Sequence, residues 1–449
     1  MKSTSLLVAA LLGSSTLISL SQLAEDRPPR SAAEKPPRGE GQLRERGEPL
    51  SPTEKYSITQ AASDKAQLHT IAFNGLAFIT GDFGASTFIP PGKVCDFFGF
   101  QYMRDIDVAV KGHNPMFLNR VAGNVLATLN TEQKQKFLDL AEEQSSQLEA
   151  LARMRLPLIK AFHRQLDAQI PAGSEGLNEA VVVRYVGDIF EKDAELSLRR
   201  AEVMAQVWRS LTPEQKAYFA KMKFGDFNSW PAIDERDKIR ETGRGKPQIF
   251  NVAYMTYASE FFSWTAGNLD ADTYFCPERH GTYFGGFYMK DMPAMGKRDY
   301  DISLSRTGDG GSDFLDALTA EQRAEVTGII AKQKKAINET IEVRRAIATE
   351  LRKYLAGETP DRAKVLALGR HYGELDGEMS WLYTMAFAKV NRTLTDSQRA
   401  ALMKIRDLDG YKSAEAYLYS RPLTGKLELP NTDSFFVAPK SASPGHPST

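Results

Sequence analysis

The chain has 449 residues, 42% of them hydrophobic and 25% charged, a composition typical of a globular protein long enough for two or three domains. Fifty-seven Lys and Arg residues balance fifty-seven Asp and Glu residues, so the chain lacks the basic excess of a non-specific nucleic-acid binder. Six His and two Cys exclude a Cys/His-rich structural zinc protein and a disulfide-rich scaffold.

Residues 1–24 have the pattern of a secretory signal peptide. Lys2 precedes an apolar run over residues 6–20, and small residues up to Ala24 suit cleavage. The alternative is an uncleaved anchor, for which the run is short and is interrupted by Gly-Ser-Ser at 13–15. We therefore expect a periplasmic or secreted protein with no membrane span after signal cleavage.

Two segments are predicted to be disordered. Residues 25–50 hold five prolines and twelve charges and read as a linker, because they offer too little apolar surface to offset the entropy of ordering. Residues 431–449, which end in a run of small polar residues and prolines, read as a disordered tail.

Alignment of the chain with itself indicates an internal duplication. The aligned blocks are 98–105 with 284–291 at an offset of 186 residues, 129–133 with 318–322 at 189, and 211–215 with 394–398 at 183. Because the offset drifts by only a few residues, we predict two tandem copies of one helical-bundle domain, 51–235 and 246–430. The predicted fold is all-α, with the copies related by a pseudo-two-fold axis.

Apolar residues recur at helical spacing in both halves. A capping box at Ser51 starts the first expected helix, and Pro157 is expected to kink one of the long helices. The expected helices are 51–79, 116–129, 131–169 and 179–211 in the first half, and 248–266, 313–318, 320–355 and 361–394 in the second.

A Leu-Thr-x-x-Gln motif, or a close variant, occurs twice in each half. Its Thr can cap a helix while its Gln, three residues later, bonds back to the cap, and each such cap is worth about 1 kcal/mol. The predicted capping pairs are Thr212 with Gln215, Thr319 with Gln322, and Thr395 with Gln398, together with Asn130 and Gln133 in the variant copy.

Paired motifs of this kind in an exported helical protein resemble the Spy/CpxP family of periplasmic stress proteins. The resemblance covers the motif-bearing helices, about half of each copy. It implies a four-helix hairpin-like fold and ATP-independent chaperone or envelope-stress-sensor activity, often linked to metal stress. Small relatives of this kind pair two chains to build their working surface, so a tandem chain is expected to be a monomer with an intramolecular pseudo-dimer.

Two acidic helix faces are candidates for a divalent metal site. A Glu-x-Asp-x-Glu pattern begins at Glu191 and again at Glu374, which places the two Glu of each set on one helix face. The candidate ligands are Glu191, Glu195, His371, Glu374 and Glu378. The alternative is salt bridges, with Arg155 and Arg344 as candidate partners, or solvated charges.

Two aromatic loops are candidates for client or ligand binding, because aromatic and Met side chains make adaptable apolar surfaces. The alternative is that they plug the ends of the bundles. The candidate residues are Phe98, Phe100, Tyr102, Met103, Phe284, Phe287, Tyr288 and Met289.

The two cysteines, Cys95 and Cys276, fall in these same loops. In an oxidising compartment an even pair favours a disulfide between the copies. The alternative is two buried thiols that act as small apolar groups.

No nucleophile elbow, P-loop, dinucleotide fingerprint or His-Glu-x-x-His motif is present in the sequence. We therefore expect a non-enzymatic exported protein whose partners are partly unfolded clients or a stress-sensor protein. The alternative is a metal- or small-ligand-binding protein that uses the acidic faces or the aromatic loops. An uncharacterised enzyme is a third hypothesis. A divalent metal is the one cofactor the sequence suggests.

Overall fold

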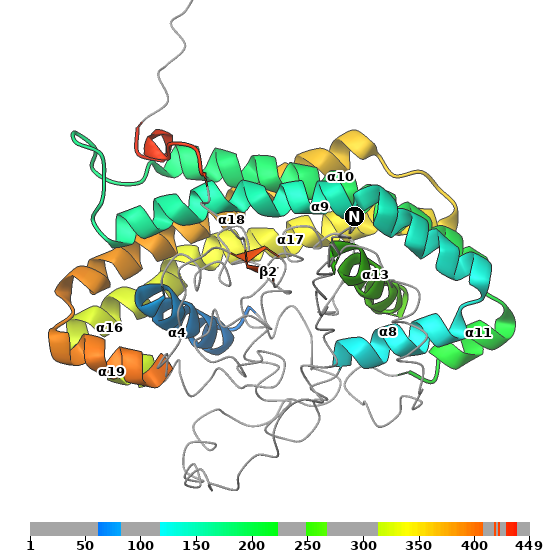
Figure 1. Ribbon diagram of the computed structural model, residues 1–449, viewed down its shortest axis with the longest axis horizontal. Coiled ribbons are helices and arrows are strands. Elements are labelled where there is room, and N and C mark those ends of the chain that lie inside the picture. The colour runs from blue at the N-terminus through cyan, green and yellow to red at the C-terminus, as the bar shows by residue number, and fades with distance from the viewer. Residues whose placement is uncertain are drawn as a thin grey trace, which may run out of the picture. The chain divides into compact units, whose positions relative to one another are not determined.

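The computed structural model describes residues 62–81, 117–222, 248–266, 313–406, 417–418, 421–422 and 428–437. These residues form an all-α fold, as the sequence predicts, with one antiparallel pair of two-residue strands (Figure 1). The elements in chain order are α4 (Asp64–Thr80), α8 (Phe117–Thr128), α9 (Thr131–Leu166), α10 (Glu179–Arg209), α11 (Pro213–Phe219), α13 (Gln248–Ala266), α16 (Ala320–Thr327), α17 (Ile329–Ala356), α18 (Arg362–Thr393), α19 (Asp396–Arg406), β1 (Tyr417–Leu418), β2 (Arg421–Pro422) and the short 3-10 helix η5 (Asp433–Phe435).

The helix boundaries follow the apolar pattern. α13 has the predicted bounds, and α9 continues through Pro157, although proline removes one backbone donor. The expected helix 320–355 is instead two helices, α16 and α17, which meet at Gly328, a residue with low helix propensity. The predicted start at Ser51 lies outside the described residues.

The centre of the fold is the contact between α10 and α18, the most extensive helix pair among the described elements (Figure 1). The two helices run antiparallel, since Gly369 lies against Ala194 and Gly377 against Val183. A Cβ atom on Gly373 would lie 2.5 Å from the Val186 carbonyl oxygen, closer than real Cβ contacts. Glycine at this position therefore permits the close approach of the two backbones.

The first described helix of each half packs on the opposite half. α4 contacts α16, α17, α18 and α19, whereas α13 contacts α8, α9 and α10 (Figure 1). The two predicted copies, 51–235 and 246–430, therefore do not pack separately from each other in their described parts. The apolar spacing assigns each helix its buried face, but it does not specify which neighbour covers that face.

Aromatic side chains anchor α13 in this exchanged position. Tyr257, Phe261 and Trp264 are all fully buried. The Phe261 ring lies 5.6 Å from the Phe137 ring on α9 and 5.9 Å from the Phe219 ring on α11, both in edge-on geometry.

Within the described ranges, no helix has both the length and the hydropathy that crossing a membrane would require.

Part of the segment predicted to be a disordered tail is ordered. Phe435 and Phe436 are buried, and the Phe435 ring packs edge-on at 5.0 Å against Tyr185 of α10. Arg164 pairs with Asp433 at 2.7 Å, and the Asn178 backbone N–H donates to the Phe435 carbonyl. The prediction for 431–449 is therefore wrong at 431–437, because two aromatic residues supply enough apolar surface to fix a short segment. Residues 438–449 lie outside the described part of the chain.

Candidate functional site

The predicted capping residues cap their helices and also bind one another. Thr212 caps α11 and Asn130 caps α9, each in a full capping box with the Gln three residues later. The Gln215 side-chain amide donates to Gln133 Oε1 at 2.8 Å and to the Thr128 carbonyl at 2.8 Å. We call this mutual pair of glutamines a clasp.

The second half contains the same clasp. Thr319 caps α16 in a capping box, and Thr395 and Gln398 exchange the two corresponding bonds at the start of α19. The Gln398 amide donates to Gln322 Oε1 at 2.7 Å and to the Ala317 carbonyl at 2.9 Å.

Each clasp satisfies carbonyl groups at helix ends, which have no partner within their own helix. In the first clasp Gln133 Nε2 donates to the carbonyl of Ser210, the C-cap of α10, at 3.1 Å. In the second, Gln322 Nε2 donates to the carbonyl of Thr393, the last residue of α18, also at 3.1 Å. The motif therefore ties the start of one helix to the end of another, a role in folding rather than in binding.

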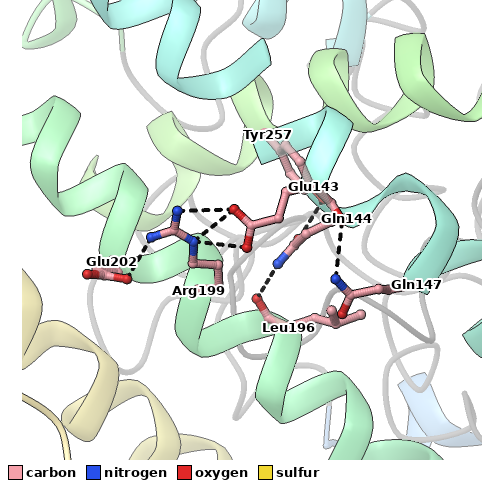
Figure 2. Close-up of polar contacts among 7 residues, drawn as sticks. All are labelled: Glu143, Gln144, Gln147, Leu196, Arg199, Glu202 and Tyr257. Atoms are coloured by element: carbon pink, nitrogen blue, oxygen red, sulfur yellow. Dashed lines mark hydrogen bonds and ion pairs between the residues drawn. The ribbon is translucent and has the colours of Figure 1, made fainter. Parts of the chain in front are cut away.

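A second polar contact holds α13 against α9 and α10 (Figure 2). The buried Gln144 amide donates to the Leu196 carbonyl at 3.1 Å, and its oxygen accepts from the Tyr257 hydroxyl at 2.7 Å. Burial raises the pKa of Tyr257, so the hydroxyl keeps its proton and donates. Beside this contact Arg199 pairs with Glu143 at 3.0 Å and with Glu202 at 2.9 Å, joining α9 to α10 at the surface (Figure 2).

Next to Tyr257 lies a buried charged cluster. Arg200 and Glu260 are fully buried, and Asp193 is 3% exposed. The Arg200 guanidinium donates to Ser197 Oγ at 2.7 Å and lies 3.5 Å from Asp193 Oδ1 and 3.6 Å from Glu260 Oε1. This cluster joins α13 to α10. The sequence analysis missed it, although a charged residue within the apolar 253–264 stretch of α13 is a signal for one.

The acidic face of α10 makes ion pairs with α18. Glu191 Oε2 lies 2.6 Å from Arg370 Nη2, which also pairs with Asp188 at 2.7 Å. Glu195 pairs with Arg362 at 2.5 Å. The hydrogen bonds that Arg370 donates to Asp188 and Glu191 raise the pKa of Arg370. The salt-bridge interpretation therefore holds for this face.

The partners found on the acidic face of α10 are Arg370 and Arg362 of α18. The expected partners, Arg155 and Arg344, are buried on α9 and α17, with 1% and 6% of their surface exposed.

On the acidic face of α18, His371 contacts two glutamates. His371 Nε2 lies 2.8 Å from Glu339, and its Nδ1 lies 3.5 Å from Glu374. Burial, and then the neighbouring carboxylates of Glu179 and Glu339, raise the pKa of Glu378.

The described residues, which include all five predicted ligands, contain no group of three or more His, Cys, Asp or Glu side chains placed to hold a metal. The prediction that Glu191, Glu195, His371, Glu374 and Glu378 bind a metal therefore stays a prediction, which this arrangement of side chains does not support. Arginines occupy the position of a cation beside Glu191 and Glu195.

The other sequence candidates lie outside the described residues. These are Cys95 and Cys276, and the aromatic-loop residues Phe98, Phe100, Tyr102, Met103, Phe284, Phe287, Tyr288 and Met289.

Among the described residues, a groove on α18, which the sequence analysis missed, is the candidate for binding. It has a volume of about 470 Å³, within the range of ligand pockets. Trp381, Leu382 and Met385 form its apolar floor, and all three are partly exposed. The sequence shows these apolar residues at helical spacing. It does not show that they stay partly exposed, because exposure is known only once the helices are packed.

The rim of the α18 groove is charged. Lys332 of α17 and Lys389 and Arg392 of α18 line it, together with the single acidic residue Glu325. Glu325 pairs with Lys389 at 2.6 Å.

No protein-family model matches this sequence, and comparisons with curated proteins and with solved structures also give no match.

Proposed function

We propose that this chain is an exported, non-enzymatic binding protein that holds partly unfolded clients without nucleotide, as the family it resembles does. The observation that supports the proposal is the α18 groove. Its partly exposed Trp381, Leu382 and Met385 offer an apolar surface of the kind that unfolded segments bind. The charged rim keeps such a surface soluble between binding events.

We further propose that the chain is a tandem duplication whose halves pair about a pseudo-two-fold axis. Three features support this. The two glutamine clasps make corresponding bonds at the repeat offsets, the aligned helices α10 and α18 pack antiparallel against each other, and α4 and α13 are exchanged between halves. A chain that contains both halves has no need of a second copy, so we expect sedimentation at the mass of one chain.

The test of client binding is suppression of aggregation by the full mature chain. Citrate synthase is unfolded by heat, and its aggregation is followed by light scattering with and without ATP. We expect suppression that depends on the amount of protein and is unaffected by ATP. Met385→Glu should weaken it, because the substitution places a charge in the groove floor.

The matched control is Met403→Glu. Met403 is also a partly exposed methionine on a helix, 43% exposed on α19, and it does not line the groove. The proposal is refuted if the unmodified protein suppresses nothing while its circular dichroism spectrum shows folded helix.

A second candidate function is the binding of a small amphipathic ligand. The groove volume favours it, since pockets of this size hold small molecules. A lipid-extractable molecule that co-purifies with the protein, together with no suppression of aggregation, would select this function over client binding.

A further inference from the structure

We infer that the α18 groove selects apolar peptide segments that carry carboxylates and rejects equally apolar segments that carry amines. This inference rests on the proposed function and names its client class. It follows from the arrangement of charge around the groove.

The floor of the groove is apolar and its largest side chain is fixed. The Trp381 indole N–H donates to the Leu177 carbonyl at 2.9 Å, which satisfies the one polar atom of that side chain. Met385 is an unbranched, adaptable side chain, and Leu382 adds aliphatic surface. This floor fits apolar side chains of varied shape, so it supplies affinity with little discrimination.

Discrimination comes from the rim, where three cations face one carboxylate. Glu325 is already paired with Lys389, at 2.6 Å. Arg392 donates one bond, from Nη2 to the Gln165 carbonyl at 3.3 Å, which leaves other guanidinium donors for a ligand. Within the part of the chain that the structure describes, no acidic side chain pairs with Lys332 or Arg392.

Two uncompensated cations beside an apolar floor complement a ligand that combines apolar and acidic groups. A carboxylate can accept a bidentate bond from Arg392, and Lys332 adds a second positive charge from α17. A peptide amine at the same place is repelled by both. The chain as a whole has no net charge, so the selectivity is a local property of this groove.

The experiment uses the full mature chain and two fluorescein-labelled peptides with the same Leu and Phe residues. One peptide carries Glu at its remaining positions and the other carries Lys. Fluorescence anisotropy measures binding at low salt. We expect the Glu peptide to bind at least about tenfold more tightly, and we expect added salt to reduce the difference because exposed charges are screened.

The variant Arg392→Glu should weaken binding of the Glu peptide by about three- to tenfold and strengthen binding of the Lys peptide, and Lys332→Glu should act in the same direction. Met385→Glu should weaken both peptides. The control is Lys404→Glu, an exposed lysine on α19 that does not line the groove, which should bind both peptides as the unmodified chain does. Melting curves exclude variants that fail to fold.

The inference is overturned if both peptides bind equally, or if Arg392→Glu and Lys404→Glu behave alike. Either result leaves the proposed function standing, provided that the unmodified chain still suppresses aggregation. Conversely, selective binding of the Glu peptide without suppression of aggregation would support the groove assignment and refute the client-holding function.

Discussion

The two long helices at the centre of the fold differ in the charge of one buried position. Arg200 of α10 lies beside Asp193 and Ser197 of the same helix and beside Glu260 of α13. At an offset of 183 residues, α18 keeps the Asp and the Ser, as Asp376 and Ser380, but has Tyr383 in place of the Arg. The Ser380 hydroxyl donates to Asp376 Oδ2 at 3.3 Å.

The anchoring of the exchanged helices differs in the same way. α13 is held by the buried charges and by the bond from Tyr257 to Gln144. α4 is held by an amide pair, in which Gln333 Nε2 donates to Gln67 Oε1 at 3.0 Å. The comparison teaches that one backbone arrangement accepts either a charged or a neutral anchor. The charged anchor is the more fragile one, because loss of a single partner leaves an uncompensated buried charge.

The largest expected effect is at Arg200. Arg200→Met should lower the free energy of unfolding by about 3–5 kcal/mol, since Asp193 and Glu260 would stay buried without their cation. Tyr383→Phe, at the aligned position, should cost less, because the change leaves no buried charge without a partner. Urea unfolding followed by circular dichroism measures both. Equal losses at the two positions would contradict the distinction between charged and neutral anchors.

A second difference concerns pH. The His163 ring of α9 packs at a tilt against the Phe78 ring of α4, with 5.2 Å between centroids, whereas Arg352, 189 residues later, lies over Trp264 of α13 at 6.0 Å. Burial lowers the pKa of His163 from 6.5 to about 4. As the pH falls below 6.5, His163 binds a proton in the unfolded chain but stays neutral in the folded chain down to about pH 4. The free energy of unfolding therefore falls between pH 6.5 and pH 4.

The stability lost to His163 between these limits should be on the order of 3 kcal/mol. His163→Gln should flatten the dependence of the unfolding free energy on pH between 6.5 and 4. Above pH 6.5, any stability that the variant loses relative to the unmodified chain reflects packing alone. Urea titrations at several pH values test this. Parallel curves for the two proteins would show that His163 does not carry the pH dependence.

The glutamine clasps should behave alike in the two halves. Gln133→Leu and Gln322→Leu each remove the capping bond and the bonds to a helix-end carbonyl, and each should cost about 2 kcal/mol. Thermal unfolding of the two variants gives the comparison. A loss confined to one half would mean that the clasps are not equivalent.

The smallest effect is expected at the exposed ion pairs. Arg370 is 39% exposed where it pairs with Asp188 and Glu191, so Arg370→Gln should cost less than about 1 kcal/mol. The cost should shrink in high salt, in contrast to that of Arg200→Met, because mobile ions screen exposed charges only. A salt-independent loss at Arg370 would indicate a packing role for its aliphatic stem.

The helices and their caps could be predicted from the sequence because both depend on local interactions. The bounds of α13 and the capping pairs at Thr212, Thr319 and Thr395 involve residues within a few positions of one another. The all-α class follows from the same apolar spacing. The apolar residues of the groove floor, Trp381, Leu382 and Met385, can be read from the sequence. Their partial exposure cannot.

Only the tertiary structure decided which surfaces meet. The exchange of α4 and α13, the pairing of Glu191 with Arg370 instead of Arg155, and the anchoring of Phe435 on Tyr185 all join residues far apart in the chain. Periodicity gives a helix its apolar face but not the partner of that face, because the free energy of apolar burial depends on area and carries no direction. The partner of each charged side chain therefore depends on the helix packed against it. The sequence alone specified only the helices that carry these side chains.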